Sequence, residues 1–110
     1  MGKSENYLER IPIRNGSISW SESDGAVTFE IENKGIMNRI MQLLLKKPKI
    51  SYVHLDEMGS FIWPIIDGEK DIIKIGEEVK AHFGEKAEPI YERLVSYFRI
   101  LESYGFINWN

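Results

Sequence analysis

The spacing of apolar residues differs between residues 17–32 and residues 56–104, and this difference constrains the fold more than any other feature. Residues 17–32 alternate between polar and apolar side chains on both sides of Asp24-Gly25, a dipeptide typical of the tight turn between two antiparallel strands. Residues 56–104 instead repeat apolar side chains every three or four positions, as helices with one buried face do. A β-hairpin followed by helices predicts one α+β domain, in agreement with a length of 110 residues.

Start and stop signals divide the second half of the chain into three helices. Asp56 is a suitable N-cap for the first helix. The second helix is expected to run from about Asp71 to Gly84, which is a suitable C-cap. Pro89 suits the first position of the third helix, which Gly105 ends.

The remaining segments complete the predicted order of elements. Residues 50–55 are β-branched and aromatic and predict a third strand. The apolar spacing of residues 36–49 predicts an extra basic helix between the second and third strands, whereas residues 1–16 are expected to form an irregular arm. We therefore expect residues 17–110 to form a single winged helix-turn-helix-like α+β domain, with a small three-stranded antiparallel sheet and a three-helix unit.

Charge is distributed unevenly along the chain. The sequence has 14 basic and 17 acidic residues, but residues 34–49 carry only basic charges and residues 50–110 carry an excess of acidic ones. The acidic helices argue against a nucleic-acid partner, because DNA affinity depends largely on neutralising phosphates. The basic segment is open to three interpretations: a cover for the sheet, a docking surface for a protein partner, or a contact with anionic lipid. The docking residues would be Arg39, Lys46, Lys47 and Lys49.

The sequence offers little that resembles catalytic chemistry. Cysteine is absent, which excludes disulfides and sites with thiolate ligands. His54 and His82 lie on different predicted elements without the spacing of a helical metal site, and no glycine-rich phosphate loop occurs. We expect no catalytic centre, no metal and no cofactor. No apolar run approaches the ~20 residues of a membrane span, and no signal peptide is recognisable, so a cytoplasmic protein is expected.

Three stretches, taken together, resemble the coenzyme PQQ synthesis protein D (PqqD-like) family. They are residues 55–68 (LDEMGSFIWPIIDG), residues 69–75 (EKDIIKI), and residues 94–101 (LVSYFRIL) followed by Gly105-Phe106-Ile107. The resemblance covers residues 50–107. It implies a small, non-catalytic winged-helix module of the precursor-peptide recognition type. Such modules bind the leader of a ribosomally made precursor peptide and present it to a modifying enzyme, often a radical-SAM enzyme.

The same resemblance implies where the peptide binds. The leader would add as a strand beside the third strand, in a groove shared with the third helix, and an exposed strand edge is suited to this mode. The backbone N–H of Val53 would either face the peptide or be paired inside the sheet, and Tyr97 would either contact the peptide or belong to the core. An alternative function is a winged-helix module for protein–protein interaction or transcription regulation. The candidate peptide-binding residues are Ser51, Tyr52, Val53, His54 and Leu55 from the strand, and Arg93, Tyr97 and Ile100 from the helix.

Overall fold

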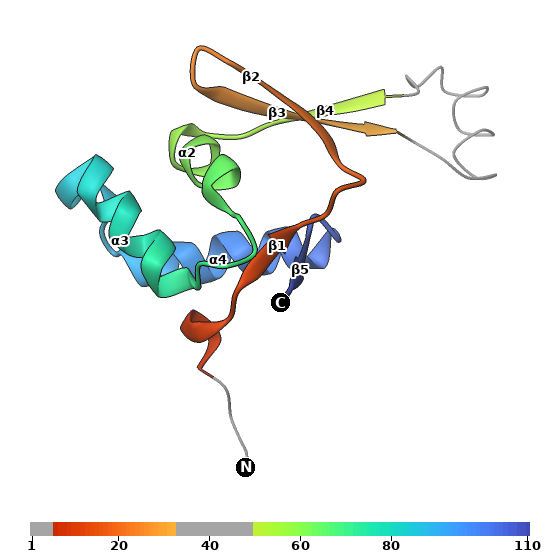
Figure 1. Cartoon of the computed structure of the whole chain (residues 1–110). Coiled ribbons are helices and arrows are strands. Elements are labelled where there is room, and N and C mark those ends of the chain that lie inside the picture. Colours follow the sequence, from red (N-terminus) through yellow and green to blue (C-terminus); the bar gives the residue numbers. More distant parts are fainter. Residues whose placement is uncertain (1–5, 33–49) are drawn as a thin grey trace.

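The predicted β-hairpin is present and forms two strands of a three-stranded antiparallel sheet (Figure 1). The computed structural model describes residues 6–32 and 50–110. Strands β2 (Ser19–Ser23) and β3 (Ala26–Glu32) meet at Asp24-Gly25. Both turn residues have positive φ angles of 53° and 79°, as a two-residue hairpin turn requires. Strand β4 (Ile50–His54), the predicted third strand, pairs with β3 so that Val53 lies opposite Phe29.

The three predicted helices are confirmed, and their caps explain where they begin and end. They are α2 (Glu57–Ile65), α3 (Ile72–Phe83) and α4 (Ile90–Ser103), with the short 3-10 helix η2 (Gly84–Ala87) after α3. The Asp56 carboxylate accepts a hydrogen bond from the Gly59 N–H at 2.7 Å, and Asp71 caps α3 in the same way. Gly84 ends α3 with a φ angle of 63°. Helix α4 begins one residue after Pro89, close to the predicted position.

The expectation that residues 1–16 form an irregular arm is wrong for part of that segment. The 3-10 helix η1 (Tyr7–Glu9) leads into strand β1 (Pro12–Arg14), which pairs antiparallel with β5 (Ile107–Trp109) in a second, two-stranded sheet. Pro12 is compatible with this strand although proline has no backbone N–H, because the hydrogen bonds between β1 and β5 form at the positions on either side of it. Ile11 accepts from Asn110 at 2.8 Å, and the Asn15 N–H donates to Phe106 at 2.9 Å. Because β1 pairs with residues about 95 positions later in the chain, no local sequence pattern predicts this strand.

The core lies between the inner face of the three-stranded sheet and the helices (Figure 1). Helix α2 lies directly under the sheet, and α3 and α4 lie beyond it. The described part of the chain therefore has an α+β fold, with a small antiparallel sheet and three α-helices. The buried apolar side chains are Val27, Phe29, Met58, Ile62, Trp63, Ile66, Ile72, Ile75, Val79, Ala87, Ile90, Leu94, Phe98, Leu101 and Ile107.

The extra helix expected over residues 36–49 lies outside the described residues, as do Arg39, Lys46, Lys47 and Lys49. Among the described residues, no helix is both long and apolar enough to cross a membrane.

Candidate functional site

A groove opens between the β3–β4 side of the sheet and the C-terminal half of α4. Its volume is about 370 Å³, and none of its lining residues carries a charge. We call it the apolar groove. It is lined by Phe29, Ile31, Ser51, Val53, Leu55, Ile100, Leu101, Tyr104 and Phe106.

The sequence builds this groove from two periodicities. Alternation along β3 and β4 directs Phe29, Ile31 and Val53 to the same face of the sheet. On the opposite wall, Leu101 is buried in the core while Ile100 lies next to it at the helix surface. The sheet therefore supplies one wall of the groove and α4 supplies the other.

The turn after α4 contributes stacked aromatic rings to the lining of the groove. Gly105 has a φ angle of 77° and lets the chain reverse immediately after Tyr104. The Phe106 ring then stacks on Tyr104, with centroids 5.6 Å apart, and meets Phe29 edge-on at 5.1 Å. These contacts hold Tyr104 at the rim of the groove.

Three of the four large exposed hydrophobic residues in the described ranges line the groove. Val53, Ile100 and Tyr104 are 39%, 56% and 70% exposed, and all three line it. Tyr52, the other large exposed hydrophobic residue in the described part of the chain, lies on the opposite face of β4. Apolar side chains that gather at one groove, rather than scatter singly, indicate a binding surface.

Strand β4 forms the edge of the described sheet beside this groove. The Leu55 N–H donates to the Val27 carbonyl at 2.9 Å, which fixes the direction of the backbone groups along the strand. Because hydrogen-bonded and non-bonded positions alternate in antiparallel pairs, the N–H of Val53 faces β3, and those of Tyr52 and His54 face away from it. Of the two alternatives for Val53, the geometry supports pairing inside the sheet.

The side chains of Tyr52 and His54 lie on the face of β4 opposite the groove. His54 Nδ1 is 3.0 Å from the Thr28 hydroxyl across the strand pair. These two residues therefore belong to the candidate site through their backbone groups, whereas Val53 belongs to it through its side chain.

Arg93 and Tyr97 make contacts within the fold and do not line the groove. Arg93 donates from Nη1 to the Lys86 carbonyl at 2.8 Å. The Tyr97 hydroxyl donates to the Gly59 carbonyl at 3.0 Å and joins α4 to α2. Burial raises the pKa of the Tyr97 hydroxyl, and the nearby Asp56 carboxylate raises it further.

The structure brings together half of the sequence-predicted site and adds residues that the sequence reasoning missed. Ser51, Val53, Leu55 and Ile100 meet in the groove. Phe29 and Ile31 could have been found from the apolar face that they share on the predicted hairpin. The position of Tyr104 instead depends on the turn at Gly105. The missed residues are Phe29, Ile31, Leu101, Tyr104 and Phe106.

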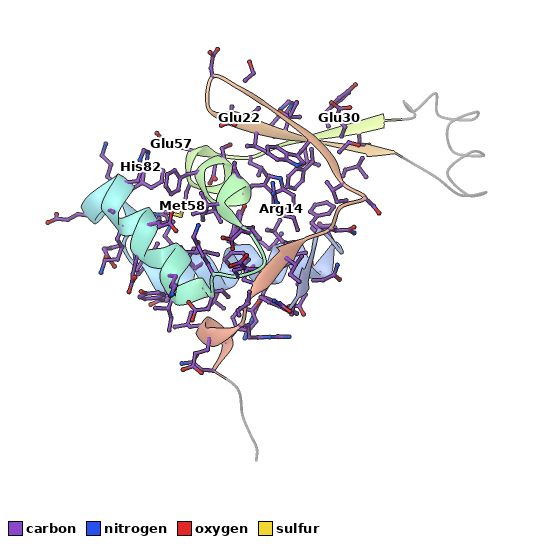
Figure 2. All side chains as sticks on the ribbon, in the orientation of Figure 1. Arg14, Glu22, Glu30, Glu57, Met58 and His82 are labelled. Carbon is purple, nitrogen blue, oxygen red and sulfur yellow. The ribbon has the colours of Figure 1, made fainter. Side chains whose placement is uncertain are left out.

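The histidines lie apart from each other and from the groove lining. Figure 2 labels His82 near the end of α3. Its ring stacks on that of Phe61 in α2, with centroids 4.4 Å apart. Within the described ranges, no group of three or more His, Cys, Asp or Glu side chains is arranged to hold a metal ion. The groove offers apolar contact and a strand edge, which are the elements of peptide recognition.

Comparison with known proteins identifies a family for this chain. No curated protein and no solved structure matches the chain. The family model described as coenzyme PQQ synthesis protein D (PqqD) matches residues 38–107, which is more than half of the 110 residues. The match includes β4, the three described α-helices and the first residue of β5. The chain therefore belongs to the coenzyme PQQ synthesis protein D family.

Proposed function

We propose that this protein binds an extended peptide as an additional strand beside β4. The observation that carries the proposal is the position of an uncharged apolar groove directly beside β4, the edge strand of the described sheet. The backbone groups of Tyr52 and His54 would pair with the peptide, and the apolar groove would receive its side chains. Strand addition of this kind supplies affinity through main-chain hydrogen bonds and specificity through side-chain pockets.

The groove also defines the pattern of the peptide. Successive side chains of a strand point to opposite faces, so every second peptide residue would face the groove. These residues are expected to be apolar, because a charged side chain would lose water there without gaining a partner. The residue between them would lie on the solvent side, next to Tyr52 and His54.

Family membership suggests the origin of the peptide and the role of the complex. We infer that the peptide is the leader of a ribosomally synthesised precursor, and that the protein presents it to a modifying enzyme without catalysing a reaction itself. The radical-SAM enzymes that relatives often serve are the proposed partner class, and the cytoplasm is the proposed compartment. In this proposal the sheet and the three helices act as a winged-helix module that binds peptide and not nucleic acid.

A pair of matched substitutions, one inside the groove and one outside it, tests the groove. The probe is a fluorescein-labelled synthetic peptide in which apolar and polar residues alternate, which is the pattern that the groove requires. Val53→Asp places a charge on the groove face and should weaken binding about tenfold or more. Ser21→Asp places the same charge at an exposed position of β2, away from β4 and outside the groove lining, and should bind within about twofold of the wild type. Equal losses in both variants would contradict the proposal.

Backbone pairing is tested separately by amide NMR. Addition of the same peptide should shift the Tyr52 and His54 amides and slow their exchange with solvent. Ile100→Asp, on the helix wall of the groove, should abolish these changes while circular dichroism remains that of the wild type, because Ile100 is 56% exposed. Binding that leaves both amides unshifted would rule out pairing at β4.

A further inference from the structure

The outward side of α4 presents a second surface, separate from the apolar groove. Five of its residues line an open hollow of about 410 Å³. With 3.6 residues per turn, these positions lie on a different side of the helix from Ile100, Leu101 and Tyr104. We call this surface the outer α4 face. It consists of Tyr91, Glu92, Val95, Ser96 and Arg99.

Two opposite charges mark the ends of the outer α4 face. Glu92 and Arg99 are both exposed and are separated by seven residues, or about 10 Å along the helix axis. In the part of the chain that the structure describes, ion pairs form on Lys70 and Lys80, and neither Glu92 nor Arg99 takes part in one. The Arg99 guanidinium lies 5.2 Å from the centroid of the Tyr7 ring, a contact that restrains it at the surface.

The residues between these charges suit close contact with another helix. Tyr91 and Val95 are half-buried and contribute apolar surface. Ser96 is exposed and small, so it does not hold a neighbouring helix away. The face therefore has an apolar middle and one charge of each sign at its ends.

We propose that the outer α4 face binds a second copy of this chain, with the two α4 helices antiparallel. A twofold axis between Val95 and Ser96 places Glu92 opposite Arg99 of the second copy, and Arg99 opposite the second copy's Glu92. The same patch is then used on both subunits, as twofold symmetry requires. A face with one charge of each sign is complementary to itself only in this antiparallel arrangement.

The contact is centred on a different side of α4 from the apolar groove, but its register places Tyr91 opposite Ile100 of the second copy, at the edge of the groove. One helix face per subunit buries less than the roughly 1,600 Å² of a standard protein interface, so the dimer is a weak one. The association therefore depends on protein concentration and on salt.

Sedimentation equilibrium of the full chain, from micromolar to millimolar concentration, tests the proposal. The average mass should rise from 12.8 kDa toward twice that value. Glu92→Arg and Arg99→Glu should each lower the association constant about tenfold, because each puts like charges together at both ends of the interface. The double variant restores opposite charges and should associate like the wild type. Arg93→Glu is the matched control, since it reverses an exposed charge of α4 outside this face.

Two results would overturn this dimer. One is a mass that stays at 12.8 kDa at the highest concentration. The other is a double variant that associates no better than the single variants, which would place any self-association elsewhere on the chain. Circular dichroism on every variant separates loss of association from loss of folding.

Discussion

The hydroxyl of Ser60 joins the first α-helix to the sheet at the point where regular strand pairing stops. Val27 lies opposite Leu55, and the Leu55 N–H donates to Val27 as expected for a paired position. The second backbone hydrogen bond expected for this pair, from Val27 to Leu55, is replaced by two bonds through the Ser60 side chain. The Val27 N–H donates to Ser60 Oγ at 2.8 Å, and this hydroxyl donates to the Leu55 carbonyl at 3.3 Å. Ser60 is only 2% exposed, so the two backbone groups depend on it.

Replacing this serine should therefore be costly. Ser60→Ala leaves the buried Val27 N–H without its acceptor and should reduce the free energy of unfolding by about 1–3 kcal/mol. Urea denaturation followed by tryptophan fluorescence measures the loss. Ser21→Ala, at an exposed position of β2, serves as the control and should change stability by less than about 0.5 kcal/mol. Similar effects of the two substitutions would show that the hydroxyl does not carry the connection.

Tyr97 gives a second test, in which pH is the variable. Tyr97→Phe removes the hydrogen bond to Gly59 and should cost about 1 kcal/mol at neutral pH. Burial raises the Tyr97 pKa in the folded state above the ordinary value of 10.0, so folding favours the protonated phenol. This contribution is complete below pH 10 and is lost as the pH rises, because only the unfolded chain releases the proton readily.

The stability difference between wild type and Tyr97→Phe should therefore shrink between about pH 9 and pH 11. Urea denaturation at a series of pH values measures it. At neutral pH, Tyr52→Phe should have little effect, because that side chain is 59% exposed. A difference that stays constant across the alkaline range would contradict the assigned burial.

At the scale of elements, the packing of α3 on α4 depends on a glycine. A Cβ atom on Gly76 would lie 2.9 Å from a Tyr91 ring carbon and 3.0 Å from a methyl carbon of Leu94. Alanine would gain about 1 kcal/mol in helix propensity but would have to displace the packed side chains of Tyr91 and Leu94. We expect the crowding to outweigh that gain, with Gly76→Ala less stable than the wild type by about 1 kcal/mol.

Thermal unfolding with circular dichroism measures this effect. Gly16→Ala is the control, because a Cβ there meets no atom within 4 Å. An increase in the melting temperature of Gly76→Ala would show that Tyr91 and Leu94 move aside without loss.

The elements that the sequence predicts correctly are those whose signals are local. The turn at Asp24-Gly25, the cap at Asp56 and the stop at Gly84 are all read within a few residues, and each is present in the structure. The candidate groove is predicted only in part because it depends on how β4 and α4 approach each other. A sequence pattern shows that Ile100 lies on α4, but it does not show that Phe106 returns to face it.

For the whole molecule, the pairing of β1 with β5 joins the two ends of the described fold. Helix η1 extends this junction: the Arg10 guanidinium lies 4.2 Å from the Trp109 ring centroid, and the Tyr7 ring meets Trp109 edge-on at 5.4 Å. The acceptor of the Trp109 indole N–H is the Glu102 carboxylate, at 3.0 Å. The first strand is thus held by α4 and β5 rather than by its own neighbours in sequence.

Breaking one ladder position tests this junction. Ile13 lies opposite Asn108, at a hydrogen-bonded position between the bonds of Ile11 and Asn15. Ile13→Pro removes its N–H and should lower the free energy of unfolding by about 1–3 kcal/mol. Ile13→Val keeps the N–H and should cost about 1 kcal/mol or less. If the two variants unfold alike in urea, the β1–β5 pairing does not contribute to global stability.

The same pairing has a consequence for synthesis on the ribosome. Strand β1 leaves the exit tunnel early, but its partner β5 is made about 95 residues later. The hairpin of β2 and β3 can form at once, since its contacts are local, whereas β1 has no strand to join until residues 107–109 have emerged. During that interval the edge of β1 is open to other chains, so this strand requires protection from premature pairing until β5 has been made.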